Sequence, residues 1–118
     1  MIKIVNQKLA EVALLEQIAA ARKANPALLT SGAVLITRVL PDGQAAAAGI
    51  ALGDILILYN ATRLDKADTL RRLEQSTATT KLVTIEVLRG AQKLLFKVRG
   101  GMLGVIPLDL SAVPVAHL

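Results

Sequence analysis

The chain has 118 residues, a formal charge of +5 and 53% hydrophobic residues, and it has no cysteine. That length fits one domain with its own core, and the lack of cysteine excludes disulfide frameworks and thiolate chemistry. Tyr59 and Phe96 are the only aromatic residues, so the core must be aliphatic. Without aromatic stacking platforms, and with basic residues scattered among acids, the charge indicates a solvated surface rather than nucleic-acid binding. No apolar run approaches the roughly 20 residues needed to span a bilayer, so we expect no membrane insertion.

The first element expected is an amphipathic helix over about residues 4–25, rich in good helix formers. Apolar residues at steps of three and four define one face: Val5, Leu9, Val12, Leu15 and Ile18. Arg22 and Lys23 suit the last turn, and Pro26 ends the element. Three roles stay open for this helix: packing on the following domain, dimerising the chain, or closing an upstream helical domain.

A second group of elements follows a short connection at residues 30–32. The β-branched run over 33–39 predicts a buried strand, and 40–43 a turn. Residues 44–48 predict a short helix closed by Gly49, and 55–59 predict the next strand.

The remaining chain predicts a longer helix, a hairpin and a last strand. The helix covers about residues 66–75, with Asp65 as its N-cap. Strands over 81–88 and 93–98 alternate apolar and polar residues, which indicates a half-buried hairpin. A last strand is expected over about 103–110. We divide the chain into an N-terminal helix and linker (1–30), a domain (31–110) and a tail (111–118).

The order of these residues resembles a bacterial PDZ domain over roughly residues 32–105. The resemblance is carried by 32–41, 45–50, 52–56, 59–60, the helix at 67–73 and the hairpin at 87–90. PDZ domains of HtrA-type serine proteases and of other bacterial proteins share this pattern. It implies an α+β fold, a partly open β-barrel or sandwich of five or six strands capped by two helices, here with an extra N-terminal helix. Gln44 and Ala61 stand where the family usually has proline and glycine.

The stretch at residues 99–105 has a basic residue, a glycine-rich turn and an apolar strand. Such glycines let backbone N–H groups converge on an anion, and the strand edge can accept a peptide. In the family, this pattern is the loop that binds a ligand's terminal carboxylate. That loop comes first in HtrA-type domains and last here, which implies a circular permutation. Pro107 lacks an N–H and fits the docking strand only where no ladder partner needs one.

The resemblance implies a peptide-binding groove between the last strand and the longer helix. Its expected residues are Arg99, Gly101, Met102, Leu103, Gly104, Val105, Ile106, Ala67, Leu70, Arg71 and Glu74. On the helix, Ala67, Arg71 and Glu74 would face the groove, with Leu70 in the core. A helix phase shifted by one residue would instead make Leu70 a groove wall.

We expect no catalysis, metal or cofactor. The single histidine, His117, has no partners for a triad or a metal cluster. No serine has a nucleophile-elbow setting, and the acids do not cluster at metal-ligand spacing.

These features favour a PDZ module that binds C-terminal, or internal extended, peptides by β-strand addition, as a regulatory or targeting domain of a larger bacterial protein. A free C-terminus is expected to bind more tightly than an amidated one. The alternative is a structural domain with an occluded groove that forms a homodimer through the N-terminal helix. The end of the tail, Ala116-His117-Leu118, is a further candidate occupant of the groove. Glu11 and Glu16 interrupt any signal-peptide core, so no such signal is expected; the compartment stays open, with bacterial cytoplasm slightly favoured.

Overall fold

The structure is a computed structural model that describes residues 2–113 and the side chains of residues 12–28 and 30–113. The helices are α1 (Ile2–Ala24), α2 (Leu28–Ser31), α3 (Gln44–Ala48) and α4 (Ala67–Ser76), with a 3-10 turn at Leu110–Ala112. The strands are β1 (Val34–Val39), β2 (Ile55–Tyr59), β3 (Thr62–Arg63), β4 (Leu82–Arg89), β5 (Gln92–Arg99) and β6 (Val105–Asp109).

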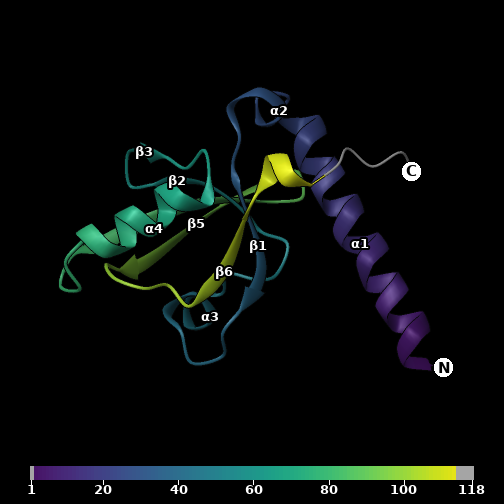
Figure 1. Cartoon of the computed structure of the whole chain (residues 1–118), viewed down its shortest axis with the longest axis horizontal. Coiled ribbons are helices and arrows are strands. Elements are labelled where there is room, and N and C mark those ends of the chain that lie inside the picture. Colours follow the sequence, from purple (N-terminus) through teal and green to yellow (C-terminus); the bar gives the residue numbers. More distant parts are fainter. Residues whose placement is uncertain (1, 114–118) are drawn as a thin grey trace.

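All six strands form one antiparallel sheet in the order β5-β4-β2-β1-β6, and β3 pairs with β2 outside that path. The first and last strands are therefore neighbours, with Val34 opposite Asp109 and Val39 opposite Val105. Their register shifts between Ile36 and Arg38, which places a bulge on β1. Within residues 2–113, β6 forms one edge of the sheet (Figure 1).

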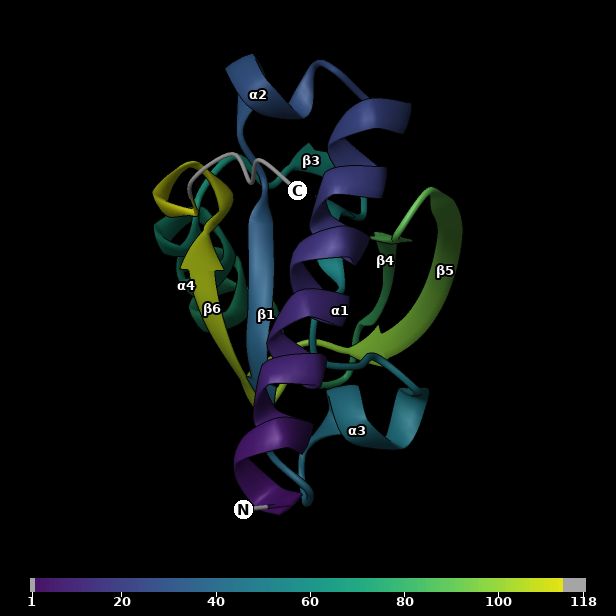
Figure 2. The same cartoon turned by 90° about the vertical axis from the view of Figure 1, so that its right-hand side faces the viewer.

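Helices cover both faces of the sheet (Figures 1 and 2). Each face has its own apolar core. Residues of α3, α4 and one sheet face form the first core, which includes Ala45, Ile36, Leu56, Tyr59, Leu70, Ile85 and Leu103. Residues of α1, α2 and the other face form the second, which includes Ile18, Ala21, Leu28, Leu35, Ile55, Leu88 and Leu110. Since both faces of β1 are covered, Val34, Leu35 and Ile36 are all buried, as the continuous apolar run predicted.

The C-terminal half of α1 is attached to the sheet by apolar and polar contacts. The side chains of Ile18 and Ala21 are buried between the helix and the sheet. The Arg22 guanidinium donates to the carbonyl oxygens of Leu110 (3.1 Å) and Val113 (2.7 Å). This half of the helix therefore packs on the domain, while dimerisation through α1 stays a prediction. The side chains of Val5 and Leu9 lie outside the described part of the helix.

The predicted α+β fold and its main elements are confirmed, with small shifts at their ends. The short elements α2 and β3 were not predicted, because they are too short to show a period. Asp65 is not the N-cap of α4, so that prediction is wrong: Lys66 holds the position and makes no side-chain cap. Instead the Asp65 carboxylate accepts a hydrogen bond from the Thr69 hydroxyl (2.7 Å).

Candidate functional site

A groove of about 400 Å³ lies between α4 and the edge strand β6. It is lined by Ala67, Arg71, Glu74, Gln75, Met102, Val105 and Pro107. Four of these residues belong to α4, and three of them, Ala67, Arg71 and Glu74, are spaced by four and three positions, which places them on one face of the helix. The groove therefore has a polar helical wall and a largely apolar wall formed by the strand and the loop before it.

The outer edge of β6 carries backbone groups that do not pair with β1. The Leu40 N–H donates to the Gly104 carbonyl (2.8 Å), and the Leu110 N–H donates to the Ala33 carbonyl (2.9 Å). Since backbone groups alternate in direction along a strand, those of Val105 and Pro107 point away from β1. A further strand can be added to the sheet at this edge.

Pro107 occupies a position where its missing N–H costs nothing within the sheet. It lies opposite Ile36, but its nitrogen faces the outer edge. An added strand would find the Val105 N–H and carbonyl, but only a carbonyl at Pro107. The proline therefore keeps the β1–β6 ladder intact and limits the edge to fewer hydrogen bonds.

Gln44 holds the loop that leads into β6. Its amide nitrogen donates to the carbonyl oxygens of Arg99 (3.1 Å), Gly100 (3.3 Å) and Met102 (3.3 Å). Its amide oxygen accepts from the Arg99 N–H (2.7 Å). The glutamine thus supplies contacts that a proline at this position could not supply, because proline has no side-chain donor.

The turn at Leu103 and Gly104 is fixed against the start of α3. Gly104 has a φ of +80°, and a Cβ on it would lie 2.8 Å from the Gly43 Cα, so a larger residue does not fit. The Leu103 carbonyl accepts a hydrogen bond from the Ala45 N–H (2.9 Å). The Leu103 side chain is fully buried.

The Leu103 N–H is already bound by a carboxylate of the same chain. Its acceptor is Glu74 Oε2, at 2.8 Å. Burial raises the pKa of Glu74 above its ordinary 4.5, and the hydrogen bond from Leu103 opposes this only in part. Among the described residues no cation forms a salt bridge with Glu74. Arg71, on the same face of α4, pairs with Asp68 (2.9 Å).

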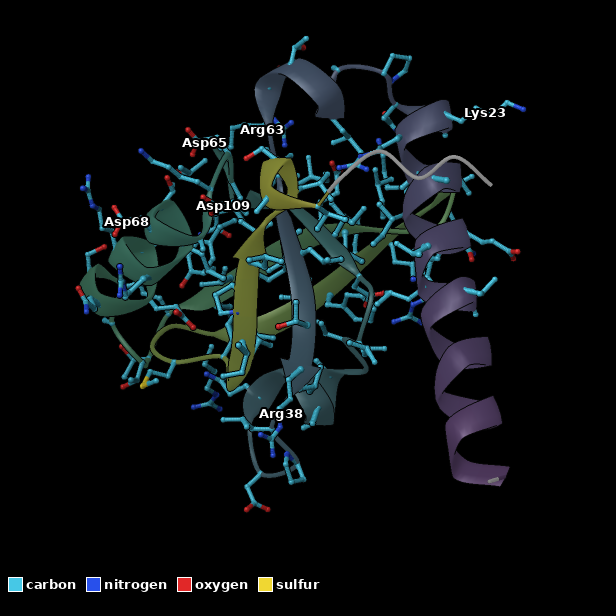
Figure 3. All side chains as sticks on the ribbon, turned by 45° about the vertical axis from the view of Figure 1, so that its right-hand side comes forward. Lys23, Arg38, Arg63, Asp65, Asp68 and Asp109 are labelled. Atoms are coloured by element: carbon cyan, nitrogen blue, oxygen red, sulfur yellow. The ribbon has the colours of Figure 1, made fainter. Side chains whose placement is uncertain are left out.

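A second carboxylate ties β6 to α4 at the other end of the groove. Asp109 Oδ1 accepts a hydrogen bond from the Ala67 N–H at 2.6 Å, and Figure 3 shows Asp109 directed toward α4. This bond supplies the cap that the N-terminus of α4 lacks from its own residues. Hydrogen bonds between a carboxylate and a backbone N–H therefore join α4 to the loop before β6 at one end of the groove and to β6 itself at the other.

The structure brings most of the expected site residues together. The groove-lining ones are Ala67, Arg71, Glu74, Met102 and Val105, while Gly101, Leu103 and Gly104 shape the loop. Gln75 and Pro107 were not among the expected groove residues. Pro107 follows Val105 by two positions, so the alternation of a strand could have indicated it.

Three expected site residues lie elsewhere. Leu70 is fully buried in the first core, which agrees with the expected helix phase and excludes the shifted phase that would make it a groove wall. Ile106 is 46% exposed and does not line the groove, since it alternates with Val105 along β6. Arg99 is exposed and lines a separate shallow depression with Gln44 and Leu82, because it alternates with the buried Val98 along β5.

Among the side chains that the structure describes, no group of three or more histidine, cysteine, aspartate or glutamate residues is placed to hold a metal ion. No helix within residues 2–113 is both long enough and apolar enough to cross a membrane. His117 and the tail end at Leu118 lie outside the described residues.

Comparison with solved structures identifies the fold. One similar structure is the crystal structure of the HtrA3 PDZ domain bound to a phage-derived ligand (FGRWV), with 24% sequence identity and a TM-score of 0.53. The match covers 75% of this chain and 72% of that chain. No protein-family model and no curated protein matches the sequence. The chain therefore has a PDZ-like fold.

Proposed function

We propose that this chain is a peptide-binding module that takes an extended peptide into the groove between α4 and β6. The observation that carries the proposal is the free outer edge of β6 beside a groove of about 400 Å³. The HtrA3 PDZ domain, which has a similar fold, was crystallised with a peptide ligand, and this supports the same class of ligand here.

The peptide would add to the sheet as a strand beside β6. Its backbone would pair with Val105 and with the Pro107 carbonyl, and alternate side chains would point into the groove or away from it. Met102 (80% exposed) offers an apolar contact at the loop end, and Arg71 and Glu74 offer polar contacts along the helix. Because backbone pairing is independent of sequence, these side chains would set the preference among peptides.

A groove-filling substitution tests this function. Ala67→Phe places a ring inside the groove, and we expect it to abolish the binding of peptides selected on the unmodified chain. Arg72→Phe is the matched control, since Arg72 is exposed on the same helix and does not line the groove. Binding is measured from amide chemical-shift changes, which also show that each variant keeps the fold. Equal binding by both variants would place the peptide site elsewhere.

We also propose that the order of the elements is a circular permutation and that the module serves a larger bacterial protein as a regulatory or targeting domain. The permutation is supported by the pairing of Val34 with Asp109, which brings the two ends of the domain side by side. Adjacent ends are the condition under which permutation is tolerated.

A structural domain with an occluded groove is the second candidate, and the Glu74–Leu103 hydrogen bond favours it. This candidate predicts a dimer and no peptide binding. Light scattering of the chain, together with the peptide titration above, separates the two functions. A monomer that binds peptides at β6 would exclude the structural role as the sole function.

A further inference from the structure

We propose that Glu74 occupies the place of a ligand's terminal carboxylate, so that the groove takes the interior of an extended chain rather than its free end. This inference rests on the proposed peptide binding and names the class of peptide. It starts from one contact in the loop that the family resemblance assigned to a ligand carboxylate: the Leu103 N–H donates to Glu74 Oε2 at 2.8 Å.

The loop cannot easily turn this N–H toward another acceptor. The Leu103 side chain is fully buried, and the Leu103 carbonyl is bound by the Ala45 N–H. Gly104, the next residue, packs against Gly43 closely enough to exclude a Cβ. The N–H therefore keeps its direction, and a ligand carboxylate would have to displace Glu74 to reach it.

The charges around the groove oppose the entry of a ligand's carboxylate. Glu74 on α4 and Asp109 on β6 stand at its two ends, each bound to one backbone N–H. Arg71 also lines the groove, but it pairs with Asp68. Arg99, the cation expected beside a ligand carboxylate, lies in a different depression.

Placing a free carboxylate next to Glu74 would bring two like charges together in a partly buried site. Like-charge contacts of this kind weaken binding strongly. A peptide that continues past this point, or ends in an amide, carries no such charge. The two carboxylates further favour a segment with lysine or arginine over an acidic one.

Three versions of one peptide pool test the inference: random hexapeptides with a free C-terminus, the same hexapeptides as C-terminal amides, and the same sequences followed by four further residues. The unmodified chain is expected to bind the amide and extended pools more tightly than the acid pool, by about tenfold or more. Binding is read by fluorescence polarisation and located by amide chemical shifts.

Substitutions of Glu74 distinguish its charge from its hydrogen bond. Glu74→Ala removes both and is expected to reverse the preference toward the acid pool. Glu74→Gln keeps an acceptor for the Leu103 N–H without the charge, and is expected to bind the acid and amide pools with closer affinities. Glu16→Ala is the matched control: it removes an exposed carboxylate from α1, outside the groove, and is expected to leave the preference unchanged.

Two results would overturn the inference, and they differ from each other. If the unmodified chain prefers the acid pool and Glu74→Ala leaves that preference unchanged, Glu74 does not exclude a carboxylate, while peptide binding itself stands. If no pool binds the unmodified chain or either Glu74 variant, the proposed peptide binding fails, and this inference fails with it.

Discussion

At the scale of single residues, the site depends on which atom accepts the hydrogen bond of the Leu103 N–H. The glycines around Leu103 predicted an anion-binding loop from residue types alone, and binding of a ligand anion there stays a prediction. The sequence could not show that Glu74, 29 positions earlier, would accept that hydrogen bond. Such a contact depends on how α4 lies against the loop, which no local pattern encodes.

The buried carboxyl of Glu74 makes a prediction about stability and pH. Burial raises the pKa of Glu74 in the folded protein above its ordinary value of 4.5. The protonation of Glu74 therefore stabilises the folded protein below pH 4.5, and this stabilisation is lost as the pH rises through the raised pKa. Glu74→Gln keeps an acceptor and cannot ionise. We therefore expect this variant to have a higher urea midpoint than the unmodified chain at neutral pH, with the difference vanishing below pH 4.5.

The control for this measurement is Glu16→Gln, at an exposed carboxyl on α1. It is expected to leave the urea midpoint nearly unchanged at both pH values, because a surface charge contributes little. A Glu74→Gln variant that is less stable than the unmodified chain at neutral pH would show that the charge strengthens the bond to Leu103 more than burial penalises it.

At the scale of elements, α1 belongs to the packed fold over its C-terminal half. Ile18 is 2% exposed and sits in the second core. We expect Ile18→Ala to lower the free energy of unfolding by about 2–5 kcal/mol, because it leaves a cavity between helix and sheet. Val12→Ala, at a position that is 43% exposed, is expected to change it by about 0.5 kcal/mol or less.

Denaturant unfolding of the two variants measures this difference. Equal, small effects would mean that α1 detaches from the sheet in solution and is free for other contacts, including a second copy of the chain. A large effect at Ile18 alone would fix this half of the helix as part of the domain.

The elements also show how far the sequence determines the fold. Local sequence patterns were enough to predict β1, β2, α3 and the β4–β5 hairpin. The β-branched runs, the alternation of apolar and polar residues and the turn glycines each indicate the structure of their own segment. The two-residue strand β3 exists only through its pairing with β2. The N-terminus of α4 is capped by Asp109, 42 positions away. Neighbouring residues alone could not indicate so distant a partner, and they indicated Asp65 instead.

At the scale of the whole molecule, the last strand is added to the sheet beside the first, and its outer edge remains free within the described residues. Natural proteins protect such edges with proline, with charges or with a covering helix. Here Pro107 and α4 do so, but the groove between them leaves room for one more strand. The proposed peptide docking would therefore use the same place as this edge protection.

Hydrogen exchange at the amide of Val105 tests the central claim most directly. If an amidated hexapeptide from the pools adds to β6 as a strand, the Val105 N–H, which faces the groove, gains protection when the peptide binds. The Leu108 N–H faces β1 and serves as the internal reference, with unchanged protection. Binding that leaves Val105 exchanging as before, with protection gained on another face of the sheet, would contradict peptide docking between α4 and β6.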